Sequence, residues 1–448
     1  MNENDKRLFD KPLEKLRPIN LVPPMQKKIT RSDLKDIETL FFERKYDLVI
    51  KKINKFIKTY QDSLNAMNIL GLAYSRLGNP DMAIGIFQSL INTFPNTSLP
   101  LTNLGNIFLA QGRIVDAINC YKGAIKLNPK ELNAMHGLGN AYFELGQSKN
   151  ALSVMQHILI LEPKNDIANY NAGNVFRGME KYKEAIPCFE NTNYKLSKSH
   201  LLECFYLLND KQNFLKCLEV LEGNKVLNPL VASLSSHSSI KYNQENRCSF
   251  CKKPFDYIYS KDLIENNLLD DKFINEIKLA TKELNLDFKE QDLLKNGSQS
   301  SGNIFLSTSP VIKKLKALIL NEIKSYHRRY KDSSDSFIKS WPSDFTLYGW
   351  VVSMTKGGGL SSHIHKEGWM SGSLYIDIPK KISPTDGDIV FSLTGANYPS
   401  DGMNFEKKGV KTKRGGLVLF PSSIFHHTLP FKSDEKRTTI AFDIIPDK

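Results

Sequence analysis

Residues 361–378 read SSHIHKEGWMSGSLYIDI, and residues 415–431 read GGLVLFPSSIFHHTLPF. Both stretches contain short runs of Val, Ile, Leu and Phe broken by Gly, Pro and Ser, and the runs TLYGWVVSM, GDIVFSL and TTIAFDII lie close to them. Several short strands at this spacing are typical of a β-sandwich or jelly roll. The spacing of apolar residues predicts two helices before the strands, over residues 270–286 and 310–326.

Histidines lie in both of these stretches. His363 and His365 are two residues apart, so on a strand their side chains would point to the same face. His426 is the first of two adjacent histidines, and Arg437 follows it by eleven residues (437 − 426). On the last predicted strand Arg437 and Thr439 share a face, so the guanidinium and the hydroxyl point toward the same space.

This ordered set of motifs resembles a family of 2-oxoglutarate–iron(II) oxygenases related to the prolyl hydroxylases. The likeness covers most of residues 263–448. It implies a double-stranded β-helix, or jelly roll, with flanking helices. It also implies that iron(II) and 2-oxoglutarate are bound, and that oxidative decarboxylation of 2-oxoglutarate is coupled to hydroxylation of a substrate. No catalytic side chain is expected beyond the ligands of the metal and of 2-oxoglutarate.

The resemblance also implies the roles of six residues. They are the metal ligands His363, His365 and His426, and the 2-oxoglutarate-binding residues Arg437, Thr439 and Tyr375. Arg437 would bind the far carboxylate of 2-oxoglutarate through two parallel hydrogen bonds, with the Thr439 hydroxyl beside it. Tyr375 and Tyr348 also fit a place in the packed core of the sandwich.

One position departs from the family pattern. Most relatives carry a carboxylate where this chain has His365. Three neutral imidazoles still bind iron(II), but the site then carries one more unit of positive charge. A shift of the pair by two residues, to His365 and Glu367, would restore the carboxylate. We favour His363 and His365, because their spacing to Tyr375 fits the pattern.

The first half of the chain repeats every 34 residues. The repeats begin at Leu64, Ser98, Leu132 and Asp166. Each has Gly at its eighth position, Tyr or Phe at its eleventh and Ala at its twentieth, and the first three end with Pro. Small residues let two antiparallel helices approach closely, and proline ends the second helix. The pattern resembles the tetratricopeptide repeat, and weaker copies over 30–63 and 198–229 extend the predicted array to 30–229.

Asparagines recur at two repeat positions that would face the groove of such an array. The sixth position carries Asn103 and Asn171, and the ninth carries Asn106, Asn140 and Asn174. Each amide offers a donor and an acceptor, so a ladder of amides could hold an extended peptide backbone. The ladder resembles the one in the repeats of O-linked N-acetylglucosamine transferase. The alternative is that these side chains bond neighbouring helices or water.

Four segments are predicted. They are an N-terminal tail (1–29), the repeat solenoid (30–229), a linker (230–262) and the oxygenase-like domain (263–448). The linker contains Cys248 and Cys251 as a Cys-x-x-Cys pair, with only His237 nearby as a further zinc ligand. A zinc site needs four ligands. We therefore expect two cysteines buried against a neighbouring domain, with a metal site as the alternative.

Composition narrows the class of protein. The 448 residues carry a net charge of +13, yet Lys and Arg alternate with acidic residues and form no cluster of five, so a nucleic-acid partner is not expected. The first residues, MNENDKRLFD, contain no apolar signal region, and no run approaches the roughly 18 apolar residues of a membrane span. Six scattered cysteines favour a reduced, cytoplasmic protein.

Two functions are compatible with these features. The first is an oxygenase whose repeat array delivers a protein or peptide substrate to the metal, because a groove raises the local concentration of its target. The alternative is a non-enzymatic adaptor, in which the repeats bind a partner protein and the barrel is a relic. Mutation of Arg437 distinguishes them, because only an enzyme would lose 2-oxoglutarate turnover.

Overall fold

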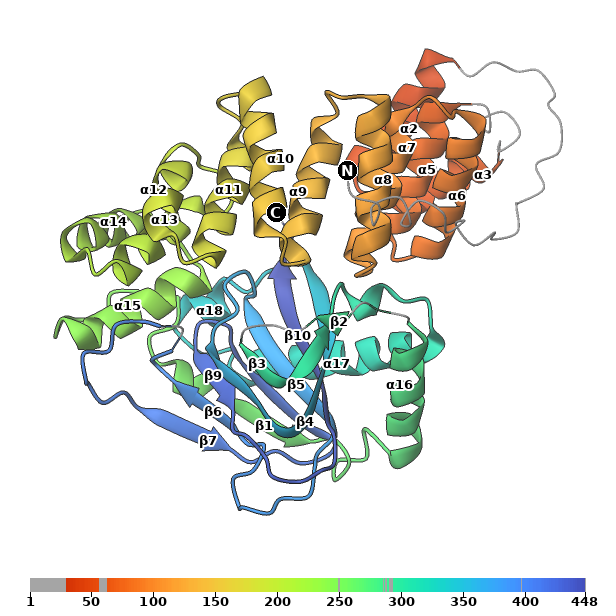
Figure 1. Cartoon of the computed structure of the whole chain (residues 1–448). Helices are drawn as coiled ribbons and strands as arrows, with labels where there is room; N and C mark the ends of the chain where they lie inside the picture. Colours follow the sequence, from red (N-terminus) through yellow and green to blue (C-terminus); the bar gives the residue numbers. More distant parts are fainter. Residues whose placement is uncertain are drawn as a thin grey trace.

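The computed structural model describes residues 30–55, 63–248, 250–284, 286, 288–289, 293–395 and 397–447. The predicted tail, residues 1–29, lies outside the described residues. An arc of paired helices lies along one side of a β-sheet domain, and further helices lie beside the sheet (Figure 1). Among the described residues, no helix is long and apolar enough to cross a membrane.

The array consists of antiparallel helix pairs, one pair for each predicted repeat. The helices are α2 (Arg31–Phe42), α3 (Tyr46–Lys55), α5 (Leu64–Arg76), α6 (Pro80–Thr93), α7 (Ser98–Ala110), α8 (Ile114–Leu127), α9 (Leu132–Glu144), α10 (Ser148–Leu161), α11 (Asp166–Gly178), α12 (Tyr182–Glu190), α13 (Ser197–Leu207) and α14 (Lys211–Gly223). The two weak copies, at the start and end of the array, are therefore helix pairs as well.

The small residues of the repeats sit where the helices approach each other. A Cβ atom on Gly71, Gly105 or Gly173 would come within 2.7 Å of an aromatic ring on the second helix of the same repeat. The alanines at the twentieth position are fully buried. Glycine and alanine therefore set the distance between paired helices, and the sequence period reflects this packing.

Residues 230–262, expected to be a linker, are packed structure instead. They hold α15 (Pro229–Lys241), the 3-10 helix η1 (Pro254–Tyr257) and strand β1 (Tyr259–Asp262). Serines disfavour a helix interior, which is why the sequence suggested a linker. Burial of most of α15 overrides that preference, and the Asn228 side chain caps the helix by accepting a bond from Val231 N at 2.9 Å.

The two cysteines of this segment are free thiols inside the largest apolar core. Burial raises the pKa of Cys248 to about 11 and raises that of Cys251 well above its usual range. Protonated thiols are poor metal ligands. Among the described residues, neither cysteine belongs to a group that could hold a metal ion.

The C-terminal part is an antiparallel, barrel-like sheet with the form of a jelly roll. Its strands after β1 are β2 (Phe288–Lys289), β3 (Leu294–Ser300), β4 (Phe345–His363), β5 (Met370–Asp377), β6 (Ile389–Ser392), β7 (Lys407–Val410), β8 (Gly416–Pro421), β9 (Phe425–Thr428) and β10 (Arg437–Pro446). The flanking helices are η2 (Ile304–Leu306), α16 (Asp271–Glu283), α17 (Pro310–Arg329) and α18 (Ser336–Lys339). The predicted fold class, an α-solenoid joined to a jelly roll with flanking helices, is confirmed.

Strand β4 belongs to both layers of the jelly roll. Its first half pairs with β10, which continues through β5 to β8. Its end pairs with β9, which continues through β6 to β7. Between the halves lie Gly357, Gly358 and Gly359, and Gly357 has φ +74°, a backbone conformation that glycine adopts without strain. Because β4 crosses between layers, its last residue, His363, lies opposite His426 of β9.

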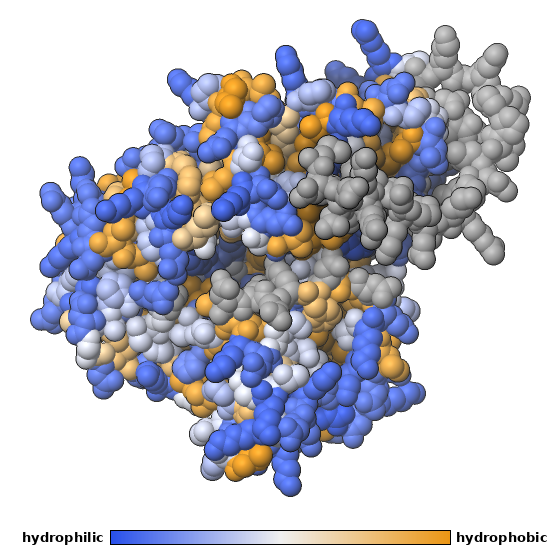
Figure 2. Space-filling view, viewed as in Figure 1, coloured by the Kyte–Doolittle hydropathy of each residue, from blue (hydrophilic) through white to orange (hydrophobic). Residues whose placement is uncertain are grey.

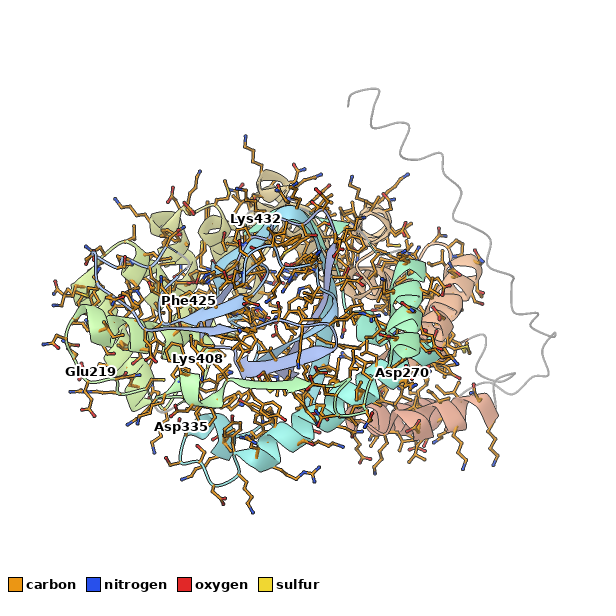
Figure 3. All side chains as sticks on the ribbon, turned by 90° about the horizontal axis from the view of Figure 1, so that it is seen from below. Glu219, Asp270, Asp335, Lys408, Phe425 and Lys432 are labelled. Atoms are coloured by element: carbon orange, nitrogen blue, oxygen red, sulfur yellow. The ribbon has the colours of Figure 1, made fainter. Side chains whose placement is uncertain are left out.

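Side chains fill the space between the two layers when the domain is seen from below (Figure 3). On the face shown in Figure 2, hydrophilic residues dominate the β-sheet domain, and hydrophobic residues form small separate patches on the array.

Turns between paired helices bring the array into contact with the barrel domain. Gly112, between α7 and α8, packs so tightly on residues 301–302 that a Cβ there would lie 2.1 Å from the Ser301 carbonyl oxygen. At the start of α6, in the preceding repeat, Asp81 accepts a hydrogen bond of 2.9 Å from the Thr308 hydroxyl. The two parts of the chain are therefore packed against each other.

The glycines of the repeat turns allow a test of this contact. Gly112 and Gly146 occupy the same repeat position with φ of +79° and +76°, but nothing lies within 4 Å of a Cβ on Gly146. Gly146→Ala should lower the free energy of unfolding by about 1–2 kcal/mol, the cost of a left-handed alanine. Gly112→Ala should cost clearly more, because its methyl group also displaces Ser301. Equal losses in urea denaturation would contradict the tight contact.

Candidate functional site

Three histidine side chains meet inside the barrel. One ring nitrogen from each of His363, His365 and His426 lies within 4.8 Å of the others, and in the described part of the chain they form the one group of this kind that could hold a metal ion. The Nε2 atoms of His363 and His365 are 3.2 Å apart. Two nitrogens bound about 2.1 Å from one ion are separated by roughly 3.0–3.4 Å, so the spacing fits a shared ion.

The His-x-His pair does not lie on one strand, contrary to our expectation. Strand β4 ends at His363, and His365 lies in the loop that leads to β5. The backbone leaves the strand because the amide of His365 donates to the carbonyl of Ser422 (3.2 Å), in the turn before β9. His365 reaches the cluster from this loop, so the loop's position determines where the nitrogen lies.

Hydrogen bonds fix the orientation of all three rings. The Nδ1 atom faces the Ser361 carbonyl in His363 (2.8 Å), the Asp443 carboxylate in His365 (2.6 Å) and the Ile424 carbonyl in His426 (3.4 Å). Each Nδ1 faces an acceptor and must carry the hydrogen, so each Nε2 keeps a lone pair for a metal.

Burial, followed by the charge of neighbouring histidines, lowers the pKa of two of these rings. The pKa of His363 falls to about 3, and that of His426 lies well below its usual range. Both imidazoles are therefore neutral near pH 7, the form that binds a metal.

Asp443 is a part of this site that our sequence analysis missed. Its carboxylate accepts the Nδ1 hydrogen of His365 and a second bond of 2.7 Å from the Ser371 hydroxyl. On β10 it continues the face of Arg437 and Thr439 at every second residue, so the alternation of the strand could have indicated it. The site thus contains a carboxylate, which is hydrogen-bonded to His365 of the histidine cluster.

Glu367, the alternative partner of His365, is not part of the cluster. Its side chain is exposed and lies outside the group of three histidines. After burial, the larger cause, the charge of Glu367 helps to raise the pKa of Tyr170 on α11. Glu367 therefore lies near Tyr170 of the repeat array.

The second set of predicted residues lies in the same barrel. Arg437 and Thr439 of β10 and Tyr375 of β5 are each at most 3 % exposed, and Thr439 is paired with Tyr375 across the strands. Three of their polar atoms are buried without a hydrogen-bond partner within the described residues: Arg437 Nε, Thr439 Oγ1 and Tyr375 OH. Such groups cost free energy unless a ligand or water satisfies them.

These polar groups suit an anion. Burial raises the pKa of Tyr375 to about 12, against the opposing charge of Arg437, so the phenol remains a neutral donor. Burial also lowers the pKa of Arg437, but a guanidinium stays protonated in proteins. The site therefore presents one buried cation and two hydroxyl donors.

An apolar wall connects the two groups. Tyr375, Phe391 and Phe420 belong to one buried cluster. The Arg437 guanidinium lies 5.1 Å from the centroid of the Tyr375 ring, and the Phe420 and His426 ring centroids are 4.6 Å apart. The buried cation and the histidine cluster thus border the same apolar surface.

The sixth-position asparagines of the array are largely turned into the helices. Asn103 is buried and donates to Asn68 Oδ1 of α5 at 2.6 Å. The Nδ2 atom of Asn171 is buried, without a hydrogen-bond partner in the part of the chain that the structure describes. Asn103 therefore bonds a neighbouring helix, as the alternative reading held.

The ninth-position asparagines are more accessible. Asn106 and Asn140 are exposed and Asn174 is half-buried. The oxygen of Asn106 accepts a bond of 2.8 Å from Tyr121 OH, and that of Asn174 accepts one of 3.1 Å from Arg177 Nη2. Of the two positions, the ninth therefore presents more of its amides to solvent.

Comparisons with protein families agree with both halves of this description. Residues 348–443 match a family described as "Putative 2OG-Fe(II) oxygenase". Residues 66–97, 105–146 and 132–165 match three families of tetratricopeptide repeats. The chain is a tetratricopeptide repeat array fused to an oxygenase-like domain. The oxygenase match spans all the predicted metal and 2-oxoglutarate residues, and Asp443 as well.

Other comparisons add little. No curated protein matches the chain. A structure of pilF from Pseudomonas aeruginosa is 13 % identical, covers 43 % of this chain and 89 % of that chain, and has a TM-score of 0.39. A MamA structure from Desulfovibrio magneticus RS-1 is 19 % identical, covers 35 % of this chain and 90 % of that chain, and has a TM-score of 0.32.

The role of Asp443 is testable without knowledge of a substrate. Asp443→Asn should weaken the binding of Fe(II) or Co(II) by about 10–100-fold, because the carboxylate no longer orients His365 or raises its basicity. Asp377→Asn, on the neighbouring strand and paired with Lys278, is the matched control and should bind normally. Anaerobic metal titration measures both, and equal affinities would rule out the role of Asp443.

Proposed function

We propose that the chain is an iron(II)- and 2-oxoglutarate-dependent oxygenase that hydroxylates a protein or peptide held by the repeat array. Three buried polar atoms, Arg437 Nε, Thr439 Oγ1 and Tyr375 OH, carry the proposal, because they lack partners in the described structure and border the same apolar surface as the histidines. A relic barrel would have little reason to keep a buried guanidinium whose Nε has no hydrogen-bond partner in the described structure. A 2-keto acid with a second carboxylate matches this arrangement, because its keto-acid end can bind a metal held by the histidines and its far carboxylate can bind Arg437.

In this proposal His363, His365 and His426 hold the metal through Nε2. Iron(II) with 2-oxoglutarate would supply the oxidising chemistry that activates dioxygen. Arg437 binds the far carboxylate, and Thr439 and Tyr375 donate to it as neutral hydroxyls. Phe391 and Phe420 exclude water from the space between the two ends, which strengthens the ionic contact.

Asp443 provides part of the charge that a carboxylate ligand gives in relatives. Its carboxylate does not bind the metal directly but accepts the Nδ1 hydrogen of the metal ligand His365. The imidazole it holds is a better electron donor to the metal than an isolated neutral ring. This arrangement offsets the extra positive charge of a site with three histidines.

The substrate is proposed to be a peptide segment, because tetratricopeptide repeats are commonly protein-binding modules. The exposed amides of Asn106, Asn140 and Asn174 would bond its backbone. The buried Asn103 and the half-buried Asn171 would support the helices around that groove rather than touch the peptide.

Anaerobic titration of the apoprotein with iron(II) and then 2-oxoglutarate tests the cofactors. The wild type should develop the weak visible charge-transfer band of the chelate, and His363→Ala should not. Arg437→Ala should bind iron normally but 2-oxoglutarate about 10–100-fold more weakly, because a charge-assisted pair of hydrogen bonds is lost.

The other results of this titration have clear meanings. Iron binding without a band would indicate a different kind of metal site. If neither iron nor 2-oxoglutarate binds, the barrel is a relic and the adaptor function is correct. Lys408→Ala, at an exposed position on β7, is a control for removal of a positive charge and should behave as wild type.

A peptide library tests the proposed substrate. Incubation with iron(II), 2-oxoglutarate and oxygen should add one oxygen atom to a subset of peptides, detected by mass spectrometry. Asn140→Ala should lower this yield several-fold, because backbone hydrogen bonds in the groove are lost. Asn150→Ala, whose side chain bonds Gln147, should leave the yield unchanged. Equal yields in both variants would exclude a role for the ninth-position asparagines.

A further inference from the structure

The loop that carries His365 is held by the repeat array. It lies between the end of β4 at His363 and the start of β5 at Met370. A loop residue is less firmly placed than one within a sheet, so other contacts must hold the His365 nitrogen near the other two. The residues on either side of His365, Ile364 and Lys366, both contact the last helices of the array.

Ile364 provides the apolar contact. It is 7 % exposed and belongs to a buried cluster formed mainly by α13, α14 and α15. The helical members of this cluster include Leu202 and Tyr206 of α13 and Leu234 of α15. Phe425, labelled in Figure 3, also belongs to it and precedes the metal-site residue His426.

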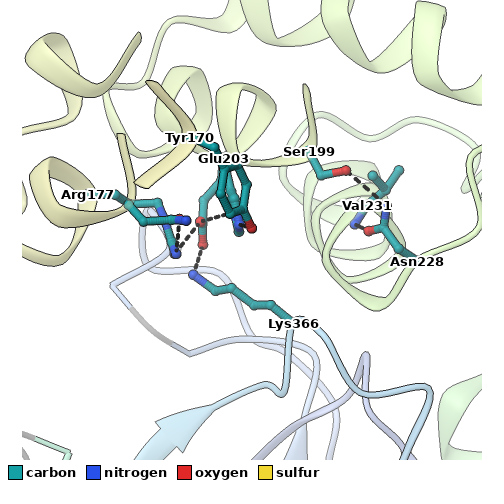
Figure 4. A network of polar contacts seen from close by, with 9 residues as sticks. Tyr170, Arg177, Ser199, Glu203, Asn228, Val231 and Lys366 are labelled. Carbon is teal, nitrogen blue, oxygen red and sulfur yellow. Dashed lines mark hydrogen bonds and ion pairs between the residues drawn. The ribbon is translucent and has the colours of Figure 1, made fainter. Parts of the chain in front are cut away.

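Lys366 provides the ionic contact. Its Nζ lies 2.6 Å from Glu203 Oε1 of α13, and the other oxygen of Glu203 lies 3.1 Å from Arg177 Nη1 of α11 (Figure 4). The Glu203 side chain is only 2 % exposed. Burial alone would raise the pKa of Glu203, but the Lys366 and Arg177 cations hold it well below its usual range. The carboxylate is thus charged, and it lies between a barrel loop and a groove helix.

The same network reaches the proposed peptide groove. Arg177 donates from Nη2 to the Asn174 oxygen at 3.1 Å. Asn174 is one of the more accessible ninth-position residues, and Tyr170 on the same helix lies beside the network in Figure 4. One chain of contacts therefore runs from Asn174 through Arg177 and Glu203 to Lys366, the neighbour of His365.

We infer that Glu203 of the repeat array is a positioning residue for the metal ligand His365. The metal site is then shared by both parts of the chain, with the barrel supplying the nitrogens and α13 holding the loop of one of them. The inference rests on the proposed metal site. It predicts an effect on metal binding from a residue of the array that does not contact the metal.

The experiment uses the full chain and Co(II) alone, whose visible spectrum reports its ligands. Glu203→Gln should weaken Co(II) binding about tenfold, at the lower end of the range for residues that support a ligand. The spectrum of its Co(II) complex should move toward that of His365→Ala. Asp81→Ala removes a different contact between array and barrel, with Thr308, and should leave both affinity and spectrum unchanged.

A double variant separates positioning from general damage to the fold. Lys366→Met removes the other side of the ion pair and should weaken Co(II) binding to a similar extent. The Glu203→Gln/Lys366→Met variant should bind no more weakly than either single variant, because both act through one contact. A merely structural role would lower thermal stability without a change in the Co(II) spectrum.

The outcomes distinguish the two proposals. If the wild type binds no Co(II), the proposed metal site is wrong and the positioning role falls with it. If the wild type binds Co(II) and Glu203→Gln gives the same affinity and spectrum, the metal site stands and the positioning role is wrong. Losses in the two single variants that add in the double variant would also contradict positioning through one ion pair.

Discussion

Strand β10 hydrogen-bonds to β4 on one side and to β5 on the other. A shift of one residue in either pairing would turn every side chain of the strand to the opposite face. Ile440, Phe442 and Ile444 pack into the core beneath the flanking helices and are almost fully buried. The cost of exposing them fixes the register, and that register holds Arg437 and Asp443 inside the barrel.

Two of the buried charges in the described structure, Arg437 and Glu203, are balanced in different ways. Arg437 lies beside Tyr375 and near Asp388, with its Nε unpaired within the described residues, an arrangement that leaves capacity for an anion. By contrast, each carboxylate oxygen of Glu203 is paired with a cation, one with Lys366 and the other with Arg177. An unsatisfied buried group points to a ligand, whereas a satisfied network points to a fixed interface. The two sites therefore suit different tasks, binding in the barrel and anchoring at the array.

Local sequence patterns accounted for the fold and for most of the candidate site. The repeat period, the strand runs and the shared face of Arg437 and Thr439 depend on spacing along the chain, which fixes faces of helices and strands. The roles of the six metal and cosubstrate residues came from the family resemblance, and His365 reaches the cluster from a loop that the spacing did not indicate. The alternation of side chains along β10 also indicates that Asp443 shares the face of Arg437, but our sequence analysis did not include it. The packing of α15 and the pairing of Glu203 with Lys366, 163 residues apart, could not be read, because such contacts depend on tertiary packing rather than on local spacing.

The repeat array holds the loop that carries His365, and this contact has a consequence for the order in which the parts of the protein fold during synthesis. Repeats contact mainly their neighbours in sequence, so the array can fold while the chain is still being synthesised. The histidine cluster cannot form until β10, the last described strand, has left the ribosome, because Asp443 lies on it. Under the proposed function, a nascent chain would therefore offer a folded groove before it could take up metal, and partner binding would precede oxidative activity in the life of each molecule.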